Sequence, residues 1–202
     1  MAFRVVEVGD PDEVVDVLSE AFRDYPVMRF VLGRDRADYE RDLRTLVGFF
    51  VMSRALRGEY LFGVRAEENP ERLEAAAIVS RPGTPTPPPL ASLREKVWES
   101  LGVDARSRYQ TFADATSPFL PSEPHLHLNM IGVRRGLQGT GRGRSLLDHV
   151  HELSRNDPRS SGISLSTENH RNVALYQHAG YVLRGHAIVS PELETWALYR
   201  ED

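Results

Sequence analysis

The sequence predicts a mixed α/β fold, with a strand–helix–strand unit at the centre of one sheet. Two observations lead to this prediction. Apolar residues alternate with polar ones over short segments, and they recur at intervals of three and four over longer segments. These segments follow one another as strand, two helices, two strands, helices, strand, helix, strand, helix and two strands. The sequence contains no internal repeat.

The first quarter of the chain predicts one strand and then helices. Residues 3–8 (FRVVEV) favour a strand, and Asp10-Pro11 is typical of a helix start. Pro26 predicts a break after that first helix, because proline lacks a backbone N–H and clashes with the preceding turn. Residues 37–56 are expected to form a long amphipathic helix that stops near Gly58.

The middle of the chain predicts an antiparallel pair of strands at 59–67 and 73–81, joined by a polar turn around Asn69-Pro70. The proline-rich segment 82–89 (PGTPTPPP) is expected to be a stiff loop, since proline removes donors and fixes φ. We expect this loop to lie inside a single domain that spans 1–202. A linker between two domains is the alternative.

The rest of the chain predicts helices and then the central strand–helix–strand unit. Residues 90–115 are expected to be helical, with a break at Gly102. The expected strands after them cover 124–133, 161–168, 181–190 and 193–200, and the expected helices cover 141–155 and 170–180. These segments complete the predicted sheet.

The composition excludes several classes of protein. The 202 residues are 41% hydrophobic, which is enough to bury a core. A formal net charge of −4 gives no overall basic field for nucleic acid, and the absence of cysteine excludes disulfides, thiolate metal sites and cysteine nucleophiles. The N-terminus lacks the layout of a signal peptide, and no apolar run approaches the ~20 residues that span a bilayer. We therefore expect a soluble, cytoplasmic protein with no nucleic-acid or membrane partner.

Residues 134–147 (RRGLQGTGRGRSLL) predict an anion-binding loop between a strand and a helix. A helix N-terminus has unpaired N–H groups and a partial positive charge, and glycine lets a ligand approach the backbone closely. Three glycines fit that role, Gly139, Gly141 and Gly143, and four arginines are expected to add cationic donors, Arg134, Arg135, Arg142 and Arg144. A solvent-facing glycine turn is the alternative for the loop taken alone.

Two common nucleotide motifs fail at this loop. Gly136 and Gly141 have the spacing of a Walker A loop, but Arg142-Gly143 replaces its Lys-Ser/Thr. Gly139-Thr140-Gly141 begins a dinucleotide fingerprint, but Arg144 occupies the position of its last glycine. Neither nucleotide motif therefore assigns a ligand to this loop.

Two further segments resemble the GNAT acetyltransferases. Residues 138–143 (QGTGRG) match Gln/Arg-x-x-Gly-x-Gly/Ala, the acyl-CoA pyrophosphate loop of that family. About thirty residues later, 168–181 (ENHRNVALYQHAGY) resembles the second GNAT signature, Asn…Leu-Tyr-x-x-x-Gly-Phe. Two motifs in this order and at this separation make the resemblance specific.

Within the family, the sequence is most similar to the puromycin N-acetyltransferase-like branch. Residues 127–143 resemble its HLxxxGVxPxxQGxGxG run, 20–32 resemble its Ala-Phe-x-x-Tyr-Pro stretch, and 194–200 resemble its final strand. The resemblance spans nearly the whole chain, but it is loose from about 60 to 120. It does not identify the acceptor.

The resemblance implies a GNAT-type fold and a reaction. The fold is a mixed, mostly antiparallel central sheet of about seven strands flanked by helices, with strands 4 and 5 splayed around acyl-CoA. The reaction moves an acetyl group from acetyl-CoA directly to an amine, which we expect to belong to a small molecule. A protein amine acetyltransferase and a non-catalytic acyl-CoA-binding or sensing module are the alternatives, and pairing into a homodimer is left open.

The resemblance also implies which residues hold acetyl-CoA: Ile131, Gly132, Val133, Gln138, Gly139, Thr140, Gly141, Arg142, Gly143, Arg144, Asn169 and Asn172. Pantetheine is expected beside the strand that ends at Val133, with a backbone N–H near Ile131 facing the thioester oxygen. The pyrophosphate is expected on the N–H groups of residues 139 to 144. Asn169 and Asn172 either bond pantetheine or cap the following helix.

Tyr176 matches the tyrosine of the family that protonates the leaving thiolate, and a core tyrosine is the alternative. For the base, strand alternation predicts that His125, His127, Asn129 and Ile131 share one polar face. His127 is the candidate base, because a histidine pKa lies near neutrality. The related branch tends to carry Glu where this chain has Ser166, which puts an acidic base at that position in doubt and favours His127. Glu168 is a further contributor only if the strand stays regular, because alternation then places it on the face of Ser166.

The acceptor site is expected to lie against the first helices. Phe22, Tyr25, Phe30 and His125 are its candidate residues, and ordinary core packing is the alternative for each aromatic one. The pair His125 and His127 has a spacing that binds zinc on a strand, but a third ligand would have to come from elsewhere. We therefore expect no metal.

Overall fold

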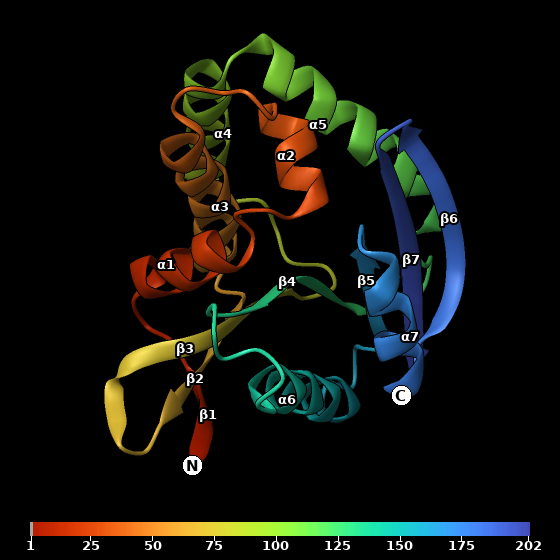
Figure 1. Cartoon of the computed structure of the whole chain (residues 1–202). Helices are drawn as coiled ribbons and strands as arrows, with labels where there is room; N and C mark the ends of the chain where they lie inside the picture. The colour runs from red at the N-terminus through yellow and green to blue at the C-terminus, as the bar shows by residue number, and fades with distance from the viewer. Residues whose placement is uncertain (1) are drawn as a thin grey trace.

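The computed structural model describes residues 2–202 and shows them as one seven-stranded sheet with helices on both faces (Figure 1). The strands are β1 (Phe3–Glu7), β2 (Tyr60–Ala66), β3 (Asn69–Ser80), β4 (Leu126–Val133), β5 (Gly162–Thr167), β6 (Val182–Ser190) and β7 (Leu193–Glu201). Their order in the sheet is β1-β2-β3-β4-β5-β7-β6, and only β4 and β5 are parallel neighbours within the described chain. The predicted mixed, mostly antiparallel sheet is confirmed.

The helices form two layers. They are α1 (Pro11–Ala21), α2 (Pro26–Leu32), α3 (Tyr39–Leu56), α4 (Pro88–Leu101), α5 (Val103–Thr116), α6 (Arg142–Asn156) and α7 (His170–His178), with a short 3₁₀ turn at Ser117–Phe119. Residues of α1 to α5 build one buried apolar cluster, and residues of α6 and α7 build the other (Figure 1). Within residues 2–202, no helix combines the length and apolar character that membrane crossing requires.

The first two helices begin at prolines. Asp10 caps α1, and its Oδ1 accepts a hydrogen bond from Asp12 N at 3.0 Å, as the sequence predicts. The predicted break after α1 is present, and Pro26 is the first residue of α2. Proline is tolerated there because the N–H it lacks has no partner in a first helical turn.

Two predicted boundaries are wrong for local reasons. The turn between β2 and β3 occupies 67–68, and Asn69 already pairs with Ala66. The segment 82–89 is not loop throughout, because α4 starts at Pro88. Prolines in a first helical turn cost little, so a proline-rich segment can start a helix. Gly102, with a φ of 90°, separates α4 from α5 as predicted.

The sheet opens between β4 and β5. These strands pair at only two positions, Leu126 with Ile163 and His127 with Ser164. Beyond these positions, β4 continues to Val133 and β5 continues to Thr167 without pairing. The predicted parting of the fourth and fifth strands is therefore present, and it leaves the backbone of β4 without a neighbour on that side.

A β-bulge in β4 changes which side chains face each layer. Met130 pairs with Ile78 and Leu128 pairs with Val79, so Asn129 is an extra residue. Leu128 packs in the cluster of α6, whereas Met130 packs in the cluster of α1 to α5. The expectation that His127 and Ile131 share a face is therefore wrong, because Ile131 packs on the α6 side with Leu128.

Candidate active site

A cavity of about 210 Å³ lies where β4 and β5 part. Its lining comes from both layers of helices as well as from the two strands. Apolar residues of α2, α3 and α5 form most of one wall, and the polar groups are Tyr25, Arg54, Tyr109, His127, Asn129, Ser166, Glu168, Asn172 and Tyr176. Several titratable groups thus face one cavity whose walls are both polar and apolar, which suits a catalytic site.

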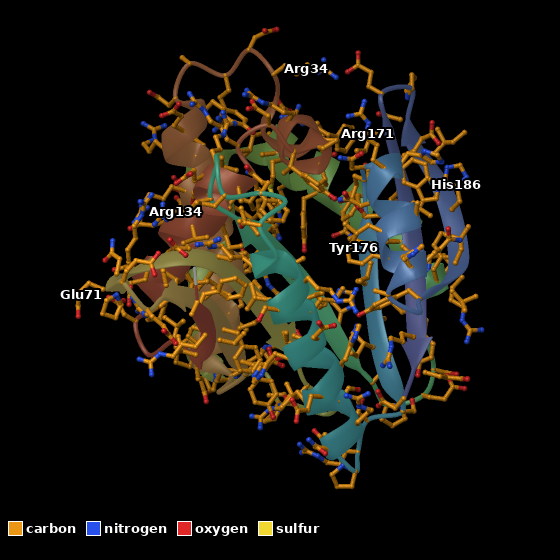
Figure 2. All side chains as sticks on the ribbon, turned by 60° about the horizontal axis from the view of Figure 1, so that its bottom comes forward. Arg34, Glu71, Arg134, Arg171, Tyr176 and His186 are labelled. Carbon is orange, nitrogen blue, oxygen red and sulfur yellow. The ribbon has the colours of Figure 1, made fainter. Side chains whose placement is uncertain are left out.

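Tyr176 faces this cavity from α7. Its ring is buried against Tyr181, and Figure 2 shows the side chain on the side of α7 that faces β4 and α6. Burial, followed by the negative charge of Glu168, raises the pKa of Tyr176 to about 12. The phenol is therefore a protonated, available donor at neutral pH.

Glu168 follows the last residue of β5 and lines the same cavity. Its side chain is buried, and Thr195 Oγ1 donates a hydrogen bond to Glu168 Oε1 at 2.8 Å. Burial raises the pKa of Glu168 to about 7, while the bond from Thr195 works against that rise. A carboxyl with this pKa is part ionised at neutral pH and suits general-base catalysis.

Tyr25 fixes the end of β5 beside Glu168. Its Oη lies 2.9 Å from Thr167 Oγ1 and accepts a hydrogen bond from Glu168 N at 3.1 Å. Burial, followed by the charge of Glu168, raises the pKa of Tyr25 well above the ordinary tyrosine value. Tyr25 therefore remains a neutral phenol that positions the backbone of Glu168.

His127 also lines the cavity, but its chemistry differs from the expected one. Its Nδ1 lies 2.7 Å from Ser164 Oγ, and burial lowers the pKa of His127 to about 4, with the charge of Arg54 as the second cause. The expectation of a near-neutral pKa is wrong, because the buried ring disfavours a positive charge. A neutral imidazole of low basicity is a weaker base than Glu168, and a catalytic role for His127 stays a prediction.

The loop before α6 has the backbone shape that an anion site requires. Gly139 and Gly141 adopt φ values of 74° and 89°, in the left-handed region that favours glycine. The first hydrogen bond within α6 runs from Ser145 N to Gly141 O at 2.9 Å. The N–H groups of Arg142, Gly143 and Arg144 precede this bond, so they lack helical partners. This arrangement fits a bound pyrophosphate.

Gln138 shapes the same loop from within. Its Oε1 accepts a hydrogen bond from Gly136 N at 3.0 Å, and its Nε2 donates to Val133 O at 3.2 Å. Thr140, the other polar residue of the loop, uses its Oγ1 to donate to Leu137 O and to accept from Arg142. Both predicted cofactor-binding side chains are therefore engaged in holding the loop, and their backbones remain exposed.

The arginines of the loop do not point their guanidinium groups at a common anion, contrary to expectation. Arg142 is only 4% exposed, and its Nε donates to Glu74 Oε2 at 2.6 Å. The other three also have carboxylate partners: Arg134 with Glu20, Arg135 with Asp24 and Arg144 with Asp148. Figure 2 shows Arg134 beside α1, the helix that carries Glu20. The N–H groups at the start of α6 are therefore the donors that this loop offers in common to one anion.

The three predicted residues at the end of β4 face different layers. Ile131 and Val133 pack on the α6 side, next to the glycine loop. Gly132 is buried on the opposite side, where an added Cβ would lie 2.7 Å from the Cβ of Ala21. Gly132 therefore permits the close approach of α1 to β4, a packing role that the sequence did not indicate.

The two predicted asparagines have separate positions. Asn169 is the N-cap of α7, and its Oδ1 accepts from Arg171 N at 3.1 Å. Asn172 lines the cavity, where its Nδ2 donates to Thr167 Oγ1 at 3.2 Å. The capping alternative thus describes Asn169, and Asn172 is the one placed beside Tyr176.

Two of the four acceptor-site candidates lie outside the cavity. Phe22 and Tyr25 line it, but Phe30 is on another side of α2 and borders a separate surface pocket with Arg34. His125 precedes β4, and its Nδ1 is bonded to Glu123 O at 2.7 Å. Among residues 2–202, no group of three or more metal-ligating side chains is close enough together to hold an ion.

Arg54 is the cavity residue that the sequence analysis missed. Its guanidinium is mostly buried, and its Nε donates to Asn129 Oδ1 at 3.2 Å. Burial lowers the pKa of Arg54, and Glu59 Oε2 lies 3.6 Å from its Nε. The signal was present in the sequence, because Leu46, Phe50 and Arg54 recur at intervals of four on one helical face.

An opened sheet beside a glycine loop, with a buried carboxyl and a phenol in one cavity, is the arrangement that the two sequence motifs predict for an acetyltransferase. The chain belongs to the GNAT family, since the model of the "Acetyltransferase (GNAT) family" matches residues 15–181. The family membership predicted from the two sequence motifs is confirmed.

Solved structures share the fold. The histone acetyltransferase HPA2 and related acetyltransferase from Corynebacterium glutamicum ATCC 13032 has a TM-score of 0.69 at 23% identity, over 100% of this chain and 97% of its own. Arylalkylamine N-acetyltransferase 2 from Aedes aegypti has a TM-score of 0.65 at 12% identity, over 98% of both chains. The polyamine N-acetyltransferase of Drosophila melanogaster has a TM-score of 0.58 at 20% identity, over 98% of both chains.

Proposed function

We propose that this acetyltransferase moves an acetyl group from acetyl-CoA directly to the amine of a small molecule. The observation that carries the proposal is the pair Glu168 and Tyr176, which line one cavity and whose pKa values are about 7 and about 12. Two titratable groups with such separated pKa values suit a base and an acid in one reaction.

Each proton of the reaction has a place in this site. As the amine nitrogen bonds the acetyl carbon and the carbon–sulfur bond breaks, Glu168 accepts the proton that the amine loses. Tyr176 Oη donates its proton to the sulfur, and the two residues are reset by exchange with solvent. No covalent bond to the protein is needed.

The donor is proposed to lie on the α6 side of the opening. The N–H groups at the start of α6 suit the pyrophosphate, and the unpaired edge of β4 near Ile131 and Val133 suits pantetheine. Asn172 and Tyr176 face the cavity from the same layer of helices. The acceptor then approaches from the layer of α2, α3 and α5.

A small acceptor is favoured by the shape of the cavity. Its walls come from α2, α3, α5 and α7 and from two strands, so the cavity is surrounded on several sides. Neighbouring structures are named for arylalkylamine, polyamine and agmatine acetylation, which supports a small amine as acceptor. A non-catalytic acyl-CoA-binding module would not require the donor Tyr176. Placement in the puromycin N-acetyltransferase-like branch stays a proposal that depends on the three sequence runs.

The test is a two-part assay on the purified chain. Acetyl-CoA should raise the melting temperature, because a ligand that binds only the folded state stabilises it. A screen of amines with acetyl-CoA should then release free thiol and form the acetylated amine. Absence of both effects at millimolar acetyl-CoA would exclude the proposal, and acetylation of peptides alone would favour a protein amine.

A further inference from the structure

A second pocket, of about 410 Å³, lies between α3, α4 and α5. Four arginines line it, Arg54, Arg57, Arg94 and Arg106, and its lining within the described chain includes no carboxylate. The whole chain carries a net charge of −4, so this concentration of positive charge runs against the overall balance. A pocket of this kind selects anions.

The positive charge of the pocket is only partly neutralised by neighbours. Glu59 lies 3.6 Å from Arg54, and Glu95 lies 3.2 Å from Arg106. Arg57 donates instead to the neutral Thr86 Oγ1 at 2.9 Å, and its buried Nε has no partner in the region described. Arg94, like Arg57, forms no ion pair with any of residues 2–202. Two guanidinium groups therefore remain for an external anion.

The arginines act on one another and on a shared tyrosine. Burial lowers the pKa of Arg54, and the negative charge of Glu59 opposes that effect. The positive charge of Arg57 lowers the pKa as well. The pKa of Tyr109 is raised by burial, and Arg54 and Arg94 both counter that rise. Arg54 and Arg94 thus act on Tyr109, which lines the same pocket as all four arginines.

The arginine pocket adjoins the active-site cavity. Phe50, Arg54 and Tyr109 line both, so Arg54 lies at their boundary. The head of Arg54 is held there by Asn129, the extra residue of the β4 bulge. Because the two cavities share this boundary, we infer that an elongated molecule with one end near Glu168 extends toward these arginines.

The pocket is separate from the loop proposed for the pyrophosphate. That loop precedes α6 on one side of the sheet, whereas α3, α4 and α5 lie on the other side (Figure 1). None of the residues from 134 to 144 lines the arginine pocket. Its ligand is therefore expected to arrive with the acceptor and not with acetyl-CoA.

We propose that the arginine pocket binds a carboxylate or phosphate at the far end of the acceptor, and that the acceptor is therefore an amine that carries an anionic group. This inference depends on the proposed function, since it assigns the same site its substrate class. Guanidinium groups bind carboxylate and phosphate oxygens through paired hydrogen bonds, and they repel a second ammonium group.

The first experiment compares acceptors that differ only in their far end. δ-Aminovalerate, pentylamine and cadaverine present a carboxylate, a methyl group and an ammonium group on similar chains, and phosphoethanolamine with ethanolamine tests a phosphate. We expect kcat/KM to be about tenfold or more higher for an anionic acceptor than for its uncharged partner, and lowest for cadaverine. Equal values for all far ends would overturn the inference.

The second experiment uses variants of the two unpaired arginines. Arg57→Gln and Arg94→Gln should raise KM for δ-aminovalerate or phosphoethanolamine severalfold and leave kcat/KM for pentylamine unchanged. Arg72→Gln is the matched control, because Arg72 is an exposed arginine on β3, outside both cavities. Equal effects of the pocket variants on charged and uncharged acceptors would contradict the inference.

A binding measurement separates this inference from the proposed function. Inorganic phosphate, without acetyl-CoA, should raise the melting temperature of the native protein more than that of Arg57→Gln/Arg94→Gln. The difference between the two isolates the pocket from phosphate held at α6. A differential shift without any acetylation would leave the anion site standing and remove the proposed reaction. Acetylation without acceptor preference or differential shift would remove the anion site alone.

Discussion

Thr195 and Glu168 form a buried hydrogen bond between two strands of the sheet's second half. Thr195 Oγ1, on β7, donates to Glu168 Oε1, directly after β5, at 2.8 Å. Thr195 is 1% exposed and Glu168 is 8% exposed. The bond fixes one carboxylate oxygen and favours the charged form, so it partly offsets the effect of burial on the pKa of Glu168. Thr195 is the first of several hydrogen-bond donors that lower the pKa of Glu168, with Ser166 and Tyr25 after it.

Glu168→Gln should reduce kcat by about a hundredfold or more, because an amide cannot accept the proton of the amine. The rise of activity with pH, centred near the Glu168 pKa of about 7, should disappear in the variant. Steady-state kinetics measured at intervals of about one pH unit, from about pH 5 to about pH 9, check both effects. Unchanged kcat would assign the base elsewhere.

Thr195→Val should move the rise of activity with pH, which is the ascending limb of the pH profile, to higher pH. The variant keeps the shape of the side chain but removes the donor that stabilises the carboxylate, so the pKa of Glu168 should rise further. The matched control is Thr111→Val, since Thr111 is exposed on α5 and bonds only the backbone of its own helix. A limb that stays in place would show that the bond to Thr195 does not tune the base.

The same carboxyl should make the stability of the native protein pH-dependent. Its pKa is about 7 when folded and 4.5 for the ordinary group, so the folded state holds the proton more tightly. This contribution to stability is full below pH 4.5 and is lost as pH rises through about 7. Glu168→Gln has no group that titrates here, so the variant does not lose this stability as pH rises. Its stability relative to the native protein should therefore improve by about 3 kcal/mol between pH 4.5 and pH 8, measured by denaturant unfolding.

Tyr176→Phe should lower kcat and leave the affinity for acetyl-CoA nearly unchanged. The ring keeps its packing against Tyr181, while the hydroxyl that donates to the sulfur is gone. The measurement is kcat together with the dissociation constant of acetyl-CoA from calorimetry. If binding falls and kcat does not, Tyr176 holds the donor instead of protonating it.

His127→Asn should keep the activity limb near pH 7, because the pKa of His127 is about 4 and Glu168 accounts for the limb. Asparagine preserves a polar contact with Ser164 Oγ. Loss of the limb in this variant, with an intact melting temperature, would restore His127 as the base. The two single variants His127→Asn and Glu168→Gln thus decide between the two candidates.

The element order and the glycine loop could be predicted because their signals are local. Alternation, helical spacing and the turn residues around Gly102 and Gly139 all act within a few residues. The partners of the loop arginines could not be predicted in this way. Arg142 and Glu74 are 68 positions apart, and Arg134 and Glu20 are 114 apart. Only the folded sheet brings such pairs together.

The bulge at Asn129 is the other feature that escaped prediction. Nothing in LHLNMIGV distinguishes an extra residue from regular alternation, and the register is set by the pairing with β3. One extra residue then reverses the faces of all positions after it. By contrast, the burial of Arg54 could have been inferred, because Arg54 continues the apolar face that Leu46 and Phe50 form on α3.

The opening between β4 and β5 separates the residues proposed for the donor from those proposed for the acceptor. The loop before α6 and the edge of β4 belong to the first group, and the walls from α2, α3 and α5 belong to the second. The two groups touch where Arg54 bonds Asn129 and where Tyr25 bonds Thr167. Substitutions in α3 or α5 away from these contacts should therefore change the accepted amine and leave acetyl-CoA binding intact, so exchange of these helices between relatives is a route to a new acceptor.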